Sequence, residues 1–297
     1  MLTVFGSVAL DTIRTPTRVV KNALGGAATY AAISASFFER PGLIAVVGND
    51  FPQRYQSLLN RFADTKGVVY ENGRTFRYEG SYDLTLTYRT TNRTELNVLK
   101  NFKPIVPQEY QKSQFVYLAN NDPAQNRRIL KEFDRVKFSM CDTIEFWIST
   151  KRNDVIKMVG AVDCVVINDE EAKLLTKTHN LIKAARKIME WGTKYVIIKK
   201  AEHGSLLFYD DIVFPSPAFS MENIVDPTGA GDSFAGGMIG YLSSKNSTKL
   251  STIKEASVYG NIMGSFAVEK YGVYGITRLK KSSIRKRFSR YRKMVHF

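Results

Sequence analysis

The sequence predicts an α/β fold in which a mostly parallel β-sheet is covered by helices on both faces and carries a smaller inserted sheet. First, short apolar runs alternate with segments of helical periodicity along most of the chain, as in strand–helix–strand units. Second, residues 68–98 alternate apolar and polar side chains, which is typical of strands with one solvent-facing side. Third, no composition break or low-complexity linker divides the 297 residues, of which 44% are hydrophobic. A single domain over residues 1–297 is therefore expected.

The N-terminal residues are expected to begin the main sheet and its helical cover. A segment of small residues without any charge follows a glycine pair, so it must form a buried helix. In chain order, we expect a strand over Leu2–Val8, an extended segment over Arg18–Lys21, a turn over Asn22–Gly26, the buried helix over Ala27–Phe38, a strand over Leu43–Val47 and an amphipathic helix over Pro52–Phe62.

The inserted sheet is expected to project from the main domain. Thr75–Tyr82 and Leu84–Arg89 alternate in polarity and are rich in aromatic and β-branched residues, which predicts a hairpin. Such strands inside a strand–helix alternation indicate a flap rather than part of the parallel sheet. We expect this flap to be a lid formed by about residues 12–21 and 68–99.

After Pro107 the strand–helix alternation resumes, which predicts the rest of the parallel sheet. Strands are expected over residues 115–118, 136–141, 164–167 and 195–198, and helices over residues 123–132, 151–159, 170–176 and 180–191. Residues 205–209 and 212–214, joined by two aspartates, predict a hairpin near the sheet edge.

A polar side chain follows each of four expected strands. These residues are Asn120, Asp142, Asn168 and Lys199. Ligands in open α/β sheets bind beyond the carboxyl ends of the strands. Each residue alone could be an ordinary cap or loop residue, but the series predicts one shared cleft.

The stretch Val225–Gly237 predicts a turn followed by a helix that begins between Gly229 and Asp232 and runs to about Ser244. The first amides of a helix lack partners within it and can hold an anion, and glycines let a phosphate approach closely. Asp232 would then be a carboxylate able to take the proton of an alcohol beside a bound phosphoryl group. The simpler alternative is that Asp232 only complements the helix dipole and the glycines only close a turn.

A second polar group, Asn168-Asp169-Glu170-Glu171, follows an expected strand. Asn168 and Glu171 have the spacing of a capping box at the start of a helix. The same two side chains could instead face the cleft and hold hydrated Mg²⁺, which keeps most of its waters and takes few carboxylates. The two interpretations are compatible.

The net charge of +15 is concentrated at the C-terminal end, where residues 271–297 contain nine basic residues and no acid. This segment could bind nucleic acid or another anionic surface. It could equally form a solvated helix that docks through Ile284, Phe288, Tyr291 and Val295, which recur at three- and four-residue spacing. We favour the docked helix, whose charge would also attract an anionic nucleotide.

Several classes of protein do not fit the sequence. No apolar run approaches the ~20 residues of a membrane span, and the N-terminus lacks the features of a signal peptide. Cys141 and Cys164 lie in apolar surroundings, and the three histidines are not spaced as metal ligands, so a disulfide scaffold and a zinc enzyme are not expected. No Walker loop occurs, which excludes a P-loop enzyme. A cytoplasmic protein is expected.

The stretch Asp226-Pro227-Thr228-Gly229-Ala230-Gly231-Asp232-Ser233-Phe234-Ala235-Gly236-Gly237 closely resembles the signature of the ribokinase (PfkB carbohydrate kinase) family. The resemblance extends to Gly6–Asp11, Gly25-Gly26 and Asn168–Glu171, and so covers nearly the whole chain. It implies a three-layer α/β/α ribokinase-like domain with a β-sheet lid, and a kinase that uses ATP. The acceptor would be a primary hydroxyl of a sugar or sugar-like molecule, and the alternatives are a nucleoside kinase and a non-catalytic protein that binds nucleic acid through its basic tail.

The resemblance also implies a role for individual residues. Asp232 would be the catalytic base and the amides of Gly229, Ala230 and Gly231 the anion hole. Asp11, Gly25 and Gly26 would face the acceptor, and Asp226 would lie near a monovalent-cation loop, in which K⁺ could bind. Asn168 and Glu171 would organise Mg²⁺ and the phosphates, while Lys199 and Gly204 belong to the nucleotide loop and Asn261 would lie near the adenine.

The chain departs from the family pattern at three positions. Ala27 and Tyr30 stand where many sugar kinases have asparagine, which leaves room for a nucleoside or a bulkier polyol. Ala201 stands where the nucleotide loop commonly has glycine, so its backbone path and the strict use of ATP are less certain. The expected partners are small molecules, with no membrane, with nucleic acid improbable, and with a homodimer through the lid.

Overall fold

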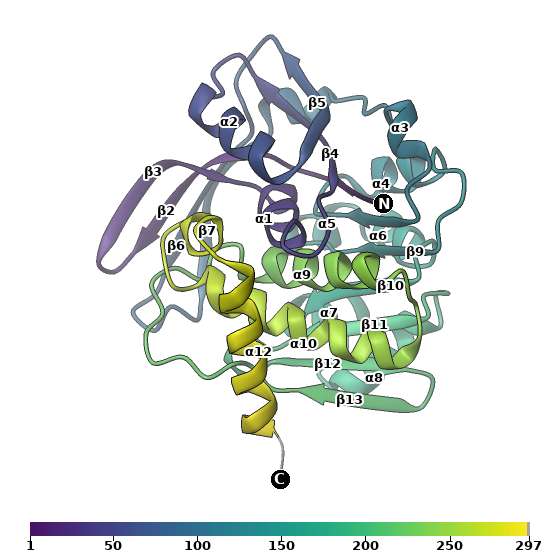
Figure 1. The fold of residues 1–297 in the computed structure, drawn as a ribbon. Helices are drawn as coiled ribbons and strands as arrows, with labels where there is room; N and C mark the ends of the chain where they lie inside the picture. Colours follow the sequence, from purple (N-terminus) through teal and green to yellow (C-terminus); the bar gives the residue numbers. More distant parts are fainter. Residues whose placement is uncertain (296–297) are drawn as a thin grey trace.

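A computed structural model describes residues 1–295, and its framework is a nine-stranded sheet (Figure 1). Seven strands are parallel and the last two, which form the expected hairpin, are antiparallel at one edge. The order across the sheet is β13 (Ile212–Ser216), β12 (Ser205–Tyr209), β11 (Tyr195–Lys199), β10 (Cys164–Asn168), β9 (Phe138–Cys141), β8 (Phe115–Leu118), β1 (Leu2–Phe5), β4 (Gly42–Gly48) and β5 (Asp64–Glu71).

The inner strands are mostly apolar, as expected where both faces of a sheet are covered, while the edge strands β5 and β13 are partly exposed. In β4, for example, Leu43, Ala45 and Val47 belong to one core cluster while Ile44 and Val46 belong to the other. The first cluster is covered by α1 (Ala27–Ala35), α2 (Gln53–Phe62), α9 (Ala230–Lys245), α10 (Leu250–Ala267), α11 (Tyr274–Thr277) and α12 (Lys281–Val295). The second is covered by α3 (Gln108–Gln111), α4 (Pro123–Leu130), α5 (Glu145–Thr150), α6 (Arg152–Val159), α7 (Asp169–Thr176) and α8 (Leu181–Met189). The predicted three layers are confirmed.

A separate four-stranded sheet projects to one side of the main sheet (Figure 1). Its order is β3 (Arg18–Gly25), β2 (Ala9–Thr15), β6 (Arg77–Tyr82) and β7 (Arg89–Glu95). The expected lid segments, 12–21 and 68–99, overlap these strands only in part. Residues 64–71 form β5, which pairs with β4 at the edge of the large sheet instead.

Two local predictions about this small sheet are wrong. The turn expected at Asn22–Gly26 is the end of β3, in which Asn22 adopts a φ of 52° where the pairing with β2 shifts register. The turn signal therefore marks a bulge within a strand. The strand expected over Leu84–Arg89 is mostly a turn, because the carboxylate of Asp83 accepts the backbone N–H groups of Thr87 and Tyr88 and Leu86 has a φ of 59°.

Other boundaries differ by a few residues. The first strand ends at Phe5 rather than Val8, since the chain leaves the large sheet there to enter β2. The buried helix ends at Ala35 instead of Phe38. The short helices α3, α5 and α11 were not expected from the sequence.

The basic C-terminal segment forms helix α12, which is docked on the body. Ile284 and Tyr291 are buried, the Tyr291 hydroxyl lies 3.0 Å from that of Ser216, and the Phe288 ring stacks on Tyr259. Val295, the last of the four expected docking residues, is 40% exposed. The docked helix explains the apolar spacing of this segment. Within residues 1–295, no helix combines the length and apolar character that a membrane span requires.

Candidate active site

Helix α9 supplies the centre of the site. It begins at Ala230, directly after Gly229, which has a φ of 76° in the left-handed region that favours glycine. The helix is packed between α1 and α10. A side chain at Gly236 would come within 2.2 Å of the Ala31 carbonyl oxygen, and one at Gly240 within 2.7 Å of the Ala35 Cα. The small residues that follow Asp232 therefore let α9 lie directly on the backbone of α1.

Asp232 lies in the first turn of α9, half-buried, within a group of charged side chains. Burial raises the pKa of its carboxyl, and the positive charges of Lys199 and Arg89 oppose this shift. A half-buried carboxylate with a raised pKa next to cations is suited to accept a proton.

Lys199 ends β11 and reaches the start of α9. A Cβ at Gly231 would lie 2.8 Å from the Lys199 Nζ, so the absence of a side chain at Gly231 makes room for the ammonium group. The charge of Lys199 also lowers the pKa of Asp142 and Glu171. The cation therefore lies among three carboxylates, beside the amides expected to bind a phosphate.

Asp142 ends β9 and is almost completely buried, with 4% exposure. One of its oxygens accepts a hydrogen bond of 2.7 Å from the Tyr117 hydroxyl. Burial, followed by the charge of Asp232, raises the pKa of Asp142 well above its usual range. Asp142, Asn168 and Lys199 lie at the ends of neighbouring parallel strands, as the strand-end series predicted, and the charges of Lys199 and Glu171 act on Asp142.

Asn168 and Glu171 form the predicted capping box at the start of α7. The Asn168 Oδ1 accepts the Glu171 N–H at 2.7 Å, and the Glu171 Oε2 accepts the Asn168 N–H at 2.9 Å. Glu171 is 8% exposed, and burial raises its pKa while Lys199 and Arg89 oppose the shift. The box accounts for one oxygen of Glu171 and fixes the direction of the carboxylate toward Lys199 and Arg89.

Asp11, in β2, is 4% exposed, and the charge of Asp232 acts on it. A side chain at Gly25 would overlap its carboxylate, at 1.9 Å from the Oδ2. Gly26 has a φ of 92°, and its backbone N–H hydrogen-bonds Asp11. Burial raises the pKa of Asp11 to about 7, and its Oδ1 has no hydrogen-bond partner within residues 1–295. The position of this carboxylate therefore requires Gly25, whereas Gly26 is required by its positive φ and by the backbone of Ser7, 2.5 Å from where its Cβ would lie.

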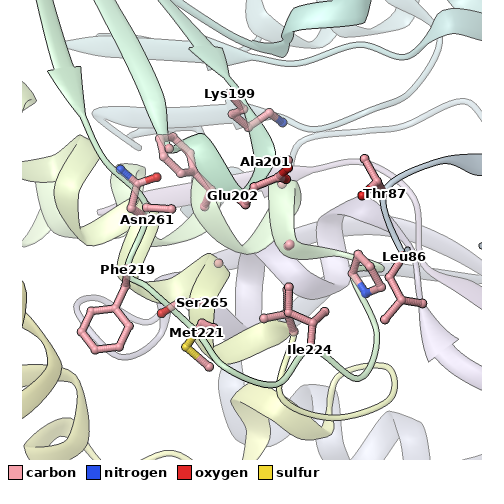
Figure 2. A pocket seen from close by; sticks show the side chains of 18 of the residues that line it. Leu86, Thr87, Lys199, Ala201, Glu202, Phe219, Met221, Ile224, Asn261 and Ser265 are labelled. Atoms are coloured by element: carbon pink, nitrogen blue, oxygen red, sulfur yellow. The ribbon is translucent and has the colours of Figure 1, made fainter. Parts of the chain in front are cut away.

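A cavity of about 510 Å³ extends from the start of α9 (Figure 2). Lys199, Ala201 and Gly204 line it from the loop after β11, and Ala230 and Gly231 from α9. Asn261 of α10 lines it as well, while its amide nitrogen donates to the Ser216 Oγ at 2.8 Å. Gly204 has a φ of 84°, and Ala201 has a φ of 46°, so the alanine adopts the conformation for which glycine is suited. Of the four residues predicted to bind the nucleotide, Lys199, Gly204 and Asn261 line this cavity, whereas Asn168 does not.

The turn of the small sheet closes another side of this cavity. Figure 2 shows Leu86 and Thr87 on the opposite side from Asn261 and Phe219. The small sheet also touches the loop before α9, where the Thr228 Oγ1 donates to the Tyr82 hydroxyl at 3.1 Å. Asp226, in the same loop, is fully buried, and its two oxygens accept the N–H groups of Thr228 and Gly272 at 2.9 and 2.8 Å.

Sequence reasoning missed several residues of this site. Arg89 is exposed to solvent at the start of β7, yet its charge acts on Asp11, Glu171 and Asp232. The loop between β13 and α9 contributes Phe219, Met221 and Ile224 to the cavity wall. Three large apolar residues within a short polar loop were a usable signal. No sequence signal indicated Arg89, because its position relative to the site depends on how the strands of the small sheet pair.

Comparisons with known proteins agree with this geometry. The model of the pfkB family carbohydrate kinases matches residues 1–278. The chain is 30% identical over 250 residues to a cytidine kinase of Thermococcus kodakarensis, which covers 80% of this chain and 87% of that protein. The fold resembles that of a nucleoside kinase from Methanocaldococcus jannaschii, with a TM-score of 0.77, 19% identity and coverage of 97% and 98% of the two chains. It also resembles aminoimidazole riboside kinase from Salmonella enterica, solved with aminoimidazole riboside and an ATP analog, with a TM-score of 0.75, 17% identity and coverage of 96% and 99%.

Proposed function

Because the chain belongs to the pfkB family of carbohydrate kinases, and is thus a phosphotransferase acting on an alcohol group, we propose that it phosphorylates a primary hydroxyl of a sugar or nucleoside with ATP. One observation carries the proposal: Asp232 lies in the first turn of α9, close to the amides of Gly229 and Gly231, with the Lys199 Nζ against Gly231. A base, an anion hole and a cation therefore meet at one end of the cavity.

In the proposed reaction, ATP occupies the cavity with its γ-phosphate at the start of α9. Asp232 accepts the proton of the acceptor hydroxyl while the hydroxyl oxygen forms a bond to the γ-phosphorus. The bond from that phosphorus to the bridging oxygen of the β-phosphate breaks, and ADP leaves with the electron pair. The amides of residues 229–231 and the Lys199 ammonium group stabilise the charge on the transferred group.

We propose that Glu171, with Asn168, holds Mg²⁺ through water molecules. Residues 1–295 contain no group of three acidic, histidine or cysteine side chains arranged to enclose a metal. This donor set fits Mg²⁺ that is bound mainly by phosphates and water, because such an ion needs only one or two carboxylates from the protein. When bound, Mg²⁺ neutralises charge on the phosphate oxygens.

Four further expectations remain proposals. The first is that K⁺ binds near Asp226, although both oxygens of that carboxylate already accept backbone N–H groups. Comparing the kinase activity in K⁺ and Na⁺ buffers tests this proposal. A homodimer through the small sheet is testable by light scattering. A cytoplasmic location is favoured by the free buried thiols of Cys141 and Cys164. The charge of α12 would attract nucleotide rather than bind nucleic acid, so we expect no retention on DNA near physiological salt.

The kinase proposal is tested by ATP consumption with cytidine, adenosine and ribose as acceptors, each of which carries a primary hydroxyl. We expect turnover with at least one of them, and Asp232→Asn should lower kcat by about 10²–10⁴-fold, the usual contribution of a positioned base. Asp211→Asn is the matched control, because it removes a fully exposed carboxylate from the β12–β13 turn. Near-normal turnover by the Asp232 variant would exclude Asp232 as the base.

A further inference from the structure

Tyr30 combines complete burial with an unpaired hydroxyl. It lies in the first turn of α1, four residues after Gly26, and is 1% exposed. Its hydroxyl has no hydrogen-bond partner within residues 1–295. Buried tyrosine hydroxyls usually have a partner, because an unpaired polar group away from water is unfavourable. Packing alone does not explain this hydroxyl, since phenylalanine would fill the same space.

The ring of Tyr30 is fixed against the anion-hole loop. A Cβ at Gly229 would lie 2.3 Å from the Tyr30 Cε1, so the ring packs directly on the glycine that precedes α9. The hydroxyl lies 3.9 Å from the position that a Cβ at Gly272 would take. The ring is thus held against Gly229, and its hydroxyl lies close to Gly272, whose N–H donates to Asp226.

The groups that surround Tyr30 are those of the acceptor side. The charges of Asp226, Asp11 and Asp232 all act on it, as does Tyr82 of the small sheet. Tyr30 does not line the cavity assigned to the nucleotide. Asp11 likewise has one carboxylate oxygen without a partner within the described residues. The acceptor side therefore holds two buried, unpaired polar atoms, of which the hydroxyl can donate and the carboxylate oxygen can accept a hydrogen bond.

We propose that Tyr30 is a specificity-determining residue whose hydroxyl donates a hydrogen bond to one hydroxyl of the acceptor, next to the hydroxyl bound by Asp11. The acceptor class is then a molecule with two adjacent secondary hydroxyls in addition to the primary hydroxyl that is phosphorylated, as in a ribose ring. This inference rests on the proposed function and adds the substrate feature that the site selects. A site with buried polar groups rejects an analogue that lacks the matching hydroxyl, because those groups then stay unpaired.

The test compares Tyr30→Phe with the wild-type enzyme on acceptors that differ by one hydroxyl. The probes are cytidine with its 2′-deoxy and 3′-deoxy forms, adenosine with the same two forms, and ribose with 2-deoxyribose. We expect the wild-type enzyme to prefer the complete ribose by at least about tenfold in kcat/KM. The variant should lose about that factor on the complete ribose and nothing on the one deoxy form that lacks the partner of Tyr30. Its KM for ATP should stay within about twofold.

Tyr110→Phe is the matched control. Tyr110 is also 1% exposed, but its hydroxyl donates to the Asp64 carbonyl oxygen at 2.9 Å, far from the site in the second core cluster. Its kinetics should match the wild type on every acceptor. Three results for Tyr30→Phe would overturn the inference and assign the hydroxyl a structural role. These are an equal loss of kcat/KM on complete and deoxy acceptors, no loss of kcat/KM on any acceptor, and failure of the variant to fold. Absence of turnover by the wild-type enzyme on every probe would instead overturn the proposed function.

Discussion

Replacing Asp11 by asparagine should stabilise the protein, and increasingly so as the pH rises. Burial raises the pKa of Asp11 from 3.8 to about 7. Since the folded pKa lies above the unfolded one, the folded state binds the extra proton. The group therefore does not oppose folding below pH 3.8, and its cost grows until the pH passes 7. Asparagine has nearly the same shape, never ionises, and can still accept the Gly26 N–H.

The size of the effect follows from the shift. A difference of about 3.2 pKa units at 1.36 kcal/mol each gives about 4 kcal/mol above pH 8, as an upper bound. At pH 5 the same relation gives only about 1.5 kcal/mol, so the advantage of the variant should widen by about 3 kcal/mol between pH 5 and pH 8.5. Because Asp11 is 4% exposed, solvent screening should reduce this difference in the free energy of unfolding only slightly.

Urea unfolding at pH 5 and pH 8.5 measures the effect, with Asp211→Asn as the control for loss of an exposed carboxylate. The Asp11 variant should also lose acceptor phosphorylation while gaining stability, as expected of a residue kept for function. A difference in the free energy of unfolding between variant and wild type that is the same at both pH values would refute the reasoning, because it would show that Asp11 titrates normally in the folded protein.

Two other substitutions test the loop after β11. Lys199→Met removes the cation that lowers the pKa of Asp232 and Glu171. The rise of kcat/KM with pH should therefore move to higher pH, and kcat should fall. An unchanged pH dependence of kcat/KM would count against this role of the Lys199 charge. Ala201→Gly relieves a φ of 46° and should raise the free energy of unfolding by about 0.5–1 kcal/mol, after the extra freedom of glycine in the unfolded chain is subtracted. Thermal unfolding of Ala201→Gly beside Ala161→Gly, a non-helical alanine with ordinary backbone angles, checks this, and equal destabilisation of both would contradict it.

The parts of the site that could be predicted from sequence are those set by short-range rules. Asp142, Asn168 and Lys199 each follow an apolar run, and parallel strands bring such ends to the same edge of the sheet. The capping box of Asn168 and Glu171 and the start of α9 at Ala230 were likewise encoded within a few residues. In these segments local preference and tertiary position agree.

The parts that could not be predicted depend on pairing between distant segments. The charge of Arg89 acts on the carboxylates because β6 and β7 pair in one register, with Asp83 capping the turn between them. The strand pattern at Leu84–Arg89 indicated β-structure without fixing where the chain reverses. The bulge at Asn22 is similar. The local residues predict a turn there, and only the pairing with β2 shows that the strand continues beyond it.

The direct contact between α9 and α1 makes the start of α9, where we propose that phosphate binds, depend on positions well inside the fold. Gly236 and Gly240 lie one and two turns beyond Asp232, where any added methyl group meets the backbone at Ala31 or Ala35. Relief of that overlap would tilt or shift helix α9, and the backbone amides at its N-terminus would move with it. Directed evolution of this enzyme toward new acceptors should therefore leave these two glycines untouched, while the cavity wall tolerates change.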